Sequence, residues 1–534
     1  MLFNLKKSNQ LSSILAPSLP MLLFGALCAV LAGVSGLLAI WCIIQLIGGK
    51  DSAYWLIFAS LCWCVSALLF ALSAWISHFS EAQFSEKLRH KVASHLTRLP
   101  AHQLANYKSD NLKRLLGDDI TAMHHLIAHL PTEVANLLIL PCLTVAFLLV
   151  ETRLIALVVL LPGLIAAICY LVIIPKLTAK QQIERFDVIA EITTSLNEYS
   201  NGITTYRTYI TNSGPLNQFK HATTHFIKNI SSRIKRVSGV VAFSTSMLQA
   251  VATFTIAYSL GKSWPIEELA SLLFFSLAVV TPALKLGHGL DYVRAGNAAA
   301  KRIEDFLQTP AIPFGQKTNL VTGSGSLTVE QLSLQTTAQM MKQRINFAVS
   351  SGTLLAISGV SGIGKSSLLR ALSGFEPSYK GTILYQGEDC SSLSEQAWSR
   401  LAMLLPQQLP VLDASVKENL ALTQPNTTDE HYNNALEQAQ LPISLSRSAS
   451  LLSGGEKQRL HLARAFLSKA KIILLDEPTN ALDKETAMRC MKQLKNYAQT
   501  QQKIIIMVTH DHTLAAQANE HLYMTKDTLC GEKL

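Results

Sequence analysis

The stretch Gly359-Val-Ser-Gly-Ile-Gly-Lys-Ser366 has the pattern G-x-x-x-x-G-K-S. A strand-like apolar run, Thr353–Ser358, precedes it, and a helix-forming segment, Ser367–Leu372, follows it. In this strand–loop–helix setting, glycines let backbone N–H groups wrap phosphates, and the helix N-terminus favours negative charge. Lys365 is expected to reach the terminal phosphates, and the hydroxyl of Ser366 to ligate Mg²⁺. The predicted nucleotide contacts are Gly359, Val360, Ser361, Gly362, Ile363, Gly364, Lys365, Ser366 and Ser367.

Two later strand ends carry residues suited to phosphoryl transfer. The apolar run Lys471–Leu475 ends in Asp476-Glu477, and the run Ile504–Val508 ends in Thr-His510. An acid at the carboxyl end of a strand beside a phosphate loop can hold Mg²⁺ through water, which is the role predicted for Asp476. Glu477 is expected to polarise the attacking water, because phosphoryl transfer depends on positioning and charge neutralisation. His510 would place a donor near the γ-phosphate, so the pattern predicts an ATP hydrolase that uses Mg²⁺.

Three further motifs complete a recognisable series. They are Pro-Gln407, Leu452-Ser-Gly-Gly-Glu-Lys-Gln-Arg459 and Asn480-Ala-Leu-Asp483. In order and spacing, together with the phosphate loop, the acidic pair and His510, they resemble the motifs of ATP-binding cassette (ABC) proteins. The resemblance implies an α/β P-loop ATPase domain.

The resemblance also implies roles that one chain alone cannot fill. In this family the phosphate loop of one cassette and the signature of another enclose each ATP, so a dimer is expected. Gln407 would ligate Mg²⁺ and link it to the membrane half, and it joins Glu477 and His510 in the expected catalytic set. The expected nucleotide contacts outside the phosphate loop are Ser453, Gly454, Gly455, Glu456 and Asp483.

The first half of the chain is strongly apolar. The whole sequence of 534 residues is 49% hydrophobic and only 15% charged, where a soluble domain usually carries about 25% charged residues. About 20 apolar residues in a helix cross a bilayer. The predicted spans are Met21–Ile47, Tyr54–Ser77, Val134–Val150, Leu154–Ile174, Val237–Leu260 and Leu269–Leu286.

The loops predict the orientation of these spans. Segments 48–53, 151–153 and 261–268 hold three basic residues, whereas connections 78–133 and 175–236 hold seven and nine. Positive charge stays in the cytoplasm. Both termini and the ATPase domain are therefore expected inside the cell, with the chain in the inner (plasma) membrane. This topology also accounts for the net charge of +10 without nucleic-acid binding.

The expected fold is an all-α six-helix transmembrane domain followed by the α/β ATPase domain. Residues 1–308 would form the transmembrane domain with long cytoplasmic helical extensions, 309–326 a linker rich in proline and glycine, and 327–534 the cassette. The whole chain resembles a half-transporter of the exporter-like fold, which would contact lipid and pair with a second half-transporter chain.

The transported substrate is not determined by these motifs. The first hypothesis is ATP-driven export of a small amphipathic or peptide-like molecule. The same fold could instead import iron–siderophore complexes, as one of two paired chains. A third possibility is a regulatory partner that barely hydrolyses ATP, but the intact Lys365, Asp476, Glu477 and His510 argue against it.

Three features depart from the family pattern. Thr336 stands where an aromatic residue would stack on adenine, and Phe347 is expected in the core instead. The chain from Gln407 to Ser453 is about a dozen residues shorter than expected, which alters the segment before the signature. The signature ends in Glu456 rather than glutamine.

Histidines are concentrated between the second and third predicted spans. Seven of the fifteen lie in residues 78–133, among them His124, His125 and His129. A metal site is conceivable there, but scattered histidines on a solvated helix face are the expected arrangement.

Overall fold

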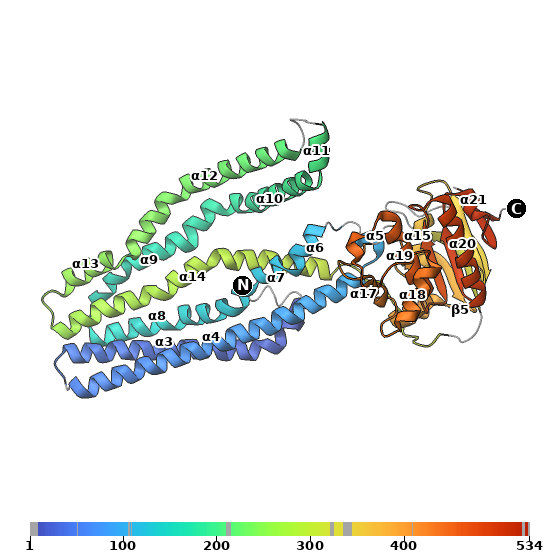
Figure 1. Ribbon diagram of the computed structural model, residues 1–534. Coiled ribbons are helices and arrows are strands. Elements are labelled where there is room, and N and C mark those ends of the chain that lie inside the picture. The colour runs from blue at the N-terminus through green and yellow to red at the C-terminus, as the bar shows by residue number, and fades with distance from the viewer. Residues whose placement is uncertain are drawn as a thin grey trace. The chain divides into compact units, whose positions relative to one another are not determined.

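The computed structural model describes residues 9–50, 52–104, 107, 109–209, 215–320, 325–334, 344–407, 410–525 and 529–531. The chain divides into two compact units (Figure 1). The first comprises Met1–Ala93 and Leu112–Gln308, and the second comprises Ser94–Asn111 and Thr309–Leu534.

The first unit is helical. Long helices run side by side, and α10 and α12 meet at α11 (Figure 1). The α-helices are α2 (Asn9–Leu15), α3 (Leu19–Ile47), α4 (Ser52–Thr97), α6 (Ser109–Leu116), α7 (Asp118–Ala122), α8 (Leu130–Glu151), α9 (Leu161–Ile168), α10 (Ile174–Asn201), α11 (Ile203–Tyr209), α12 (Pro215–Leu248), α13 (Ala250–Gly261) and α14 (Ile266–Leu307). Helices α4 and α6 continue into the second unit at their ends. Two π-helical segments, His125–His129 and Cys169–Ile173, interrupt the α-helical pattern.

Four helical stretches of the described chain are long and apolar enough to cross a membrane. They are Gln10–Ile47, Ser52–Thr97, Asn111–Glu151 and Leu216–Gly261. These stretches contain the first, second, third and fifth predicted spans. The sixth predicted span lies inside α14.

The fourth predicted span is not one continuous α-helix. Leu154–Leu160 forms a 3₁₀ helix, and α9 follows with Pro162 in its first turn. Proline suits the first turn of an α-helix but cannot donate a backbone hydrogen bond inside one, so a helix boundary falls there.

The surface of the helical unit fits a lipid environment. On α4, Leu56, Ile57, Leu68 and Trp75 are 59 to 71% exposed. Exposed apolar side chains on this scale are typical of a surface that meets lipid or another protein. Leu37, Ile44, Leu148 and Phe275 pack together in the interior of the same unit. This unit is a helical transmembrane domain.

The second unit contains two sheets. The four-stranded sheet has the order β2-β1-β4-β5, and the six-stranded sheet has the order β10-β9-β3-β8-β7-β6. The strands are β1 (Ser326–Leu334), β2 (Ile345–Ser350), β3 (Leu354–Gly359), β4 (Tyr379–Tyr385), β5 (Glu388–Asp389), β6 (Ala402–Leu405), β7 (Ile472–Asp476), β8 (Ile504–Val508), β9 (Glu520–Met524) and β10 (Leu529–Gly531). The helices are α5 (Ala101–Leu104), α15 (Lys365–Leu372), α16 (Glu395–Leu401), α17 (Val416–Ala421), α18 (Asp429–Gln438), α19 (Gly454–Leu467), α20 (Lys484–Thr500) and α21 (His512–Ala515).

The six-stranded sheet explains where the site forms. Strands β3, β7 and β8 are parallel neighbours, and their apolar residues are buried because both faces are covered. They correspond to the three apolar runs identified in the sequence. Ligands of open α/β sheets bind beyond the carboxyl ends of such strands.

A short segment from the first half of the chain belongs to the second unit. The N–H of Ala101 donates to the carbonyl of Phe375, and Nδ1 of His102 lies 2.8 Å from Oε2 of Glu376. The carboxylate of Glu376 is buried, so this histidine supplies a polar partner that burial demands. Residues 94–111 therefore pack with residues 309–534, whereas the boundary expected at residue 308 placed them in the membrane domain.

Candidate functional site

The phosphate loop lies between β3 and α15, as its motif predicts. Three glycines carry the positive φ angles that bend it: Gly359 (150°), Gly362 (79°) and Gly364 (106°). A Cβ on Gly359 would lie 2.4 Å from the carbonyl oxygen of Met524, so this glycine is also required by close packing. The shape of the loop therefore requires glycine at these positions.

Lys365 begins α15 at the end of this loop. Its Nζ donates to the carbonyls of Gly359 (2.8 Å) and Val360 (2.9 Å), and the residue is only 5% exposed. Burial lowers the pKa of Lys365, while the nearby Glu477 and Asp476 act in the opposite direction. The ammonium group is thus held where phosphates would bind, with two acids close enough to favour its charge.

Glu477 has the most organised carboxylate in the site. Its Oε2 accepts from Nε2 of Gln407 (2.7 Å) and from Nδ2 of Asn480 (3.2 Å). Its Oε1 lies 2.8 Å from Nε2 of His510. Its backbone has a positive φ of 50° and donates to the carbonyl of Val508. The structure therefore brings the three residues of the expected catalytic set, Glu477, His510 and Gln407, into direct contact.

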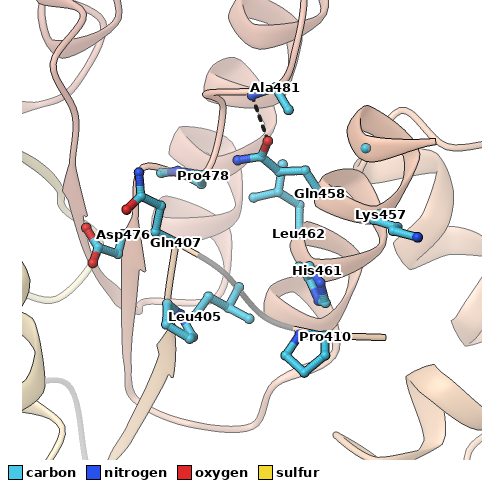
Figure 2. A pocket seen from close by; sticks show the side chains of 12 residues that line it. Leu405, Gln407, Pro410, Lys457, Gln458, His461, Leu462, Asp476, Pro478 and Ala481 are labelled. Carbon is cyan, nitrogen blue, oxygen red and sulfur yellow. Dashed lines mark hydrogen bonds between the residues drawn. The ribbon is translucent and has the colours of Figure 1, made fainter. Parts of the chain in front are cut away.

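The turn that follows Glu477 is tied to the signature helix. Nε2 of Gln458 on α19 donates to the carbonyl of Glu477 (2.8 Å), and its Oε1 accepts from the N–H of Ala481 (2.7 Å). Figure 2 shows the bond between the N–H of Ala481 and Oε1 of Gln458, at the edge of a cleft of about 540 Å³. Gln407 and Asp476 lie side by side at one part of the cleft. Lys457 and His461, on α19, line the cleft across from them (Figure 2).

The signature begins α19 with a capping box. The N–H of Glu456 donates to Oγ of Ser453, and the N–H of Ser453 donates to Oε2 of Glu456 (2.8 Å). These bonds lower the pKa of Glu456. Ser453 and Gly454 are exposed, and a Cβ on Gly454 would meet open space. The backbone of the signature is therefore accessible from outside the unit.

Two departures from the family pattern are physically linked. Arg447, from the shortened segment, donates to Oε1 of Glu456 (3.1 Å). The same segment is held against the start of α17, because the N–H groups of Val416 and Lys417 donate to the carbonyls of Arg447 and Leu445. Glutamate at position 456 gives the short segment an ionic partner that glutamine would not provide.

The remaining predicted residues have clear positions. Asp483 caps α20 by accepting from the N–H of Thr486 (2.9 Å), which lowers its pKa. Phe347 packs against the buried core, as expected. Thr336 lies outside the described residues.

Sequence reasoning missed three residues that organise the site: Asn480, Gln458 and Arg447. Asn480 lies three residues after Glu477, and this position is a signal for a contact across a turn. Gln458 and Arg447 act through contacts between separate segments, which no spacing indicates.

The donor set fits a magnesium nucleotide. Ser366 lies in the first turn of α15, Asp476 ends β7 and is only 9% exposed, and Gln407 uses its amide nitrogen on Glu477. The hydroxyl, carboxylate and amide oxygens of these residues are the kind of ligand that Mg²⁺ prefers. These three residues could hold the ion, and the loop around Lys365 could hold the phosphates.

Comparisons with known families agree with this geometry. Residues 22–282 match the ABC transporter transmembrane region, and residues 342–480 match the ABC transporter family model. A solved structure of a bacterial Atm1-family ABC exporter with ATP bound superposes with a TM-score of 0.77. It covers 97% of this chain and 94% of its own, at 16% sequence identity, and therefore shows the fold alone.

Curated relatives differ in what they are named for. The mycobactin import ATP-binding/permease protein IrtA of Mycolicibacterium smegmatis is 27% identical over 84% of this chain and 54% of its own. The lactococcin-A transport/processing ATP-binding protein LcnC of Lactococcus lactis is 28% identical over 66% of this chain and 51% of its own. The glutathione/L-cysteine transport protein CydC of Escherichia coli is 29% identical over 52% of this chain and 51% of its own. The chain spans about half the length of these relatives. From the two family matches, the order of the motifs and the fold, it follows that the chain belongs to the ABC transporters.

Proposed function

We propose that this chain is one half of a dimeric transporter that hydrolyses ATP to move a small amphipathic or peptide-like molecule out of the cytoplasm. The observation that carries the ATPase part is the carboxylate of Glu477, held between Gln407, Asn480 and His510 beside the phosphate loop. A carboxylate in this setting can orient a water molecule and accept its proton. A subunit that merely binds nucleotide would not need such a group.

The proposed roles follow from the placement of each residue. Lys365 and the loop N–H groups bind the phosphates, and Ser366, Asp476 and Gln407 hold Mg²⁺. The ion would neutralise phosphate charge. Glu477 accepts a proton from the attacking water, and His510 holds the carboxylate and can donate toward the γ-phosphate. The signature, Ser453–Glu456, in which Ser453 and Gly454 are exposed, contacts ATP on the partner together with Asp483.

The proposed membrane arrangement keeps both termini and the ATPase domain in the cytoplasm, with the helical domain in the inner membrane. The asymmetry of basic residues between the loops supports it. The partner is a second half-transporter chain, either another copy or a chain of different sequence.

Import of an iron–siderophore complex is the second candidate, since IrtA, which matches most of this chain, is named for mycobactin import. Proteoliposomes distinguish the two directions. ATP added outside energises only the molecules whose cassettes face outward. Export would then appear as accumulation of a labelled amphipathic peptide in the lumen, and import as ATP-dependent release of a preloaded ferric siderophore. A failure of ATP to move either class would refute both assignments.

A further inference from the structure

Three histidines of the membrane unit converge from separate segments. His78 lies on α4, just after the second predicted span, and His124 and His129 precede the third. The ring centroid of His78 lies 5.2 Å from that of His124 and 5.1 Å from that of His129. The centroids of His124 and His129 are 5.4 Å apart. One ring nitrogen from each histidine lies within 4.8 Å of the other two. His124 and His129 are partly buried and His78 is exposed, and because the three rings converge, the expected scattered arrangement does not hold for this group.

A π-helical turn creates this convergence. Residues 125–129 form a π-helix, and the N–H of Leu130 donates to the carbonyl of His125, five residues earlier. In an α-helix, residues five apart would be rotated by about 140° and face different sides. The wider π-turn brings His124 and His129 to one side. Such single turns occur frequently at functional sites.

A carboxylate lies behind one of the imidazoles. Oε2 of Glu81, on α4, is 3.1 Å from Nδ1 of His124. A carboxylate on one ring nitrogen fixes the tautomer and leaves the lone pair of the other nitrogen free to bind a metal, an arrangement seen in most histidine metal sites. His125 adjoins this group, with its ring centroid 5.0 Å from that of His129. It stacks on Tyr292 of α14, its Nε2 lies 3.7 Å from Oε1 of Glu133, and it is not among the three histidines whose ring nitrogens converge.

The dimensions suit a small cation. Two imidazole nitrogens bound to tetrahedral Zn²⁺ at about 2.05 Å are about 3.4 Å apart. The three nitrogens lie within 4.8 Å of one another, so each pair reaches this spacing by closing at most about 1.4 Å, which side-chain rotation provides. Three protein ligands leave a fourth position for water or a small molecule. His78 and His129 also line a cavity of about 360 Å³ with Thr132 and Asn136.

We propose that His78, His124 and His129 bind one divalent transition-metal ion such as Zn²⁺, with Glu81 as the residue that orients His124. Imidazole nitrogens select ions of this class, whereas Mg²⁺ and Ca²⁺ prefer oxygen ligands. The site lies in the membrane unit and is separate from the Mg²⁺ expected at the nucleotide.

Zinc titration of the full chain tests the proposal. The protein is purified without a polyhistidine tag, stripped with a chelator and placed in nanodiscs, and Zn²⁺ alone is titrated against a fluorescent competitor. The wild type should bind one Zn²⁺ per chain at this site. His129→Ala and His78→Ala should weaken that binding by more than about 100-fold, and Glu81→Gln by about 10- to 100-fold.

His90→Ala is the matched control, since His90 is an exposed histidine on the same helix. It should leave Zn²⁺ affinity unchanged. ATP binding by every variant shows that the nucleotide-binding unit remains folded, and it separates this test from transport. Because His78 is exposed, His78→Ala should leave the fold intact even if His129→Ala, at a more buried position, disturbs it. Absence of Zn²⁺ binding by the wild type, or equal affinity in all the variants, would overturn the proposal.

Discussion

Replacing Glu477 with glutamine tests the assignment of the catalytic base. The change keeps the size of the side chain and removes its charge and its ability to accept a proton. The amide oxygen can still accept from Gln407 and Asn480, which both donate to Oε2 in the wild type. The other end of the amide would present an NH₂ group to Nε2 of His510, which lies 2.8 Å from Oε1. The local structure should therefore survive while the chemistry fails.

The size of the effect follows from the role. General-base catalysis contributes about 10²- to 10⁴-fold in rate, which corresponds to about 3 to 5 kcal/mol of barrier. Glu477→Gln should lower the steady-state ATPase rate by that factor and leave ATP affinity close to that of the wild type. Because ATP is bound but not hydrolysed, the closed dimer should accumulate.

The assay is ATP turnover in nanodiscs, with binding of a fluorescent ATP analogue measured in parallel. Glu485→Gln is the charge-matched control, because the side chain of Glu485 on α20 is 80% exposed and forms a surface ion pair with Arg489. It should turn over at the wild-type rate. Near-normal turnover by Glu477→Gln would refute the role of this carboxylate, and lost ATP binding would show that the change disrupts the site instead.

Further predictions concern the loop, the signature and the dimer. Lys365→Ala should weaken ATP binding by roughly 10- to 150-fold, since a charged hydrogen bond is worth about 1.5–3 kcal/mol, and unchanged affinity in an equilibrium titration would contradict the phosphate-loop assignment. Glu456→Ala should speed amide hydrogen exchange in the first turn of α19 by roughly 2- to 30-fold, because a helix cap contributes about 0.5–2 kcal/mol, whereas Glu456→Gln should keep the capping box and lose only the ionic contact with Arg447. Equal exchange in both variants would argue against the box. In a homodimer, mixing a Lys365→Ala chain with a Ser453→Arg chain should restore part of the ATPase activity that each lacks alone, because one composite site then carries neither change. If one intact site suffices for turnover and the mixture still recovers no ATPase activity, the result would argue against sites shared between chains.

The sequence by itself determined the order of the parts and most of the nucleotide site. The phosphate loop, the acid pair and His510 could be located because each follows a short apolar run, and parallel buried strands read as continuous apolar segments. The membrane half could be located because a run of about 20 consecutive apolar residues indicates a helix that crosses a bilayer. These signals are local, so no knowledge of distant contacts was needed.

Only the tertiary structure decided which residues act together. Gln458 and Arg447 hold the site through contacts between separate segments, whereas Asn480 contacts Glu477 across a turn. The pairing of Arg447 with Glu456 links two departures that looked independent in the sequence. The histidine cluster depends on a π-turn, which moves His129 to the side of His124 and against His78. Helical periodicity assumes a uniform 100° per residue, so a single wider turn escapes it, and the meeting of two helices is set by packing rather than by spacing.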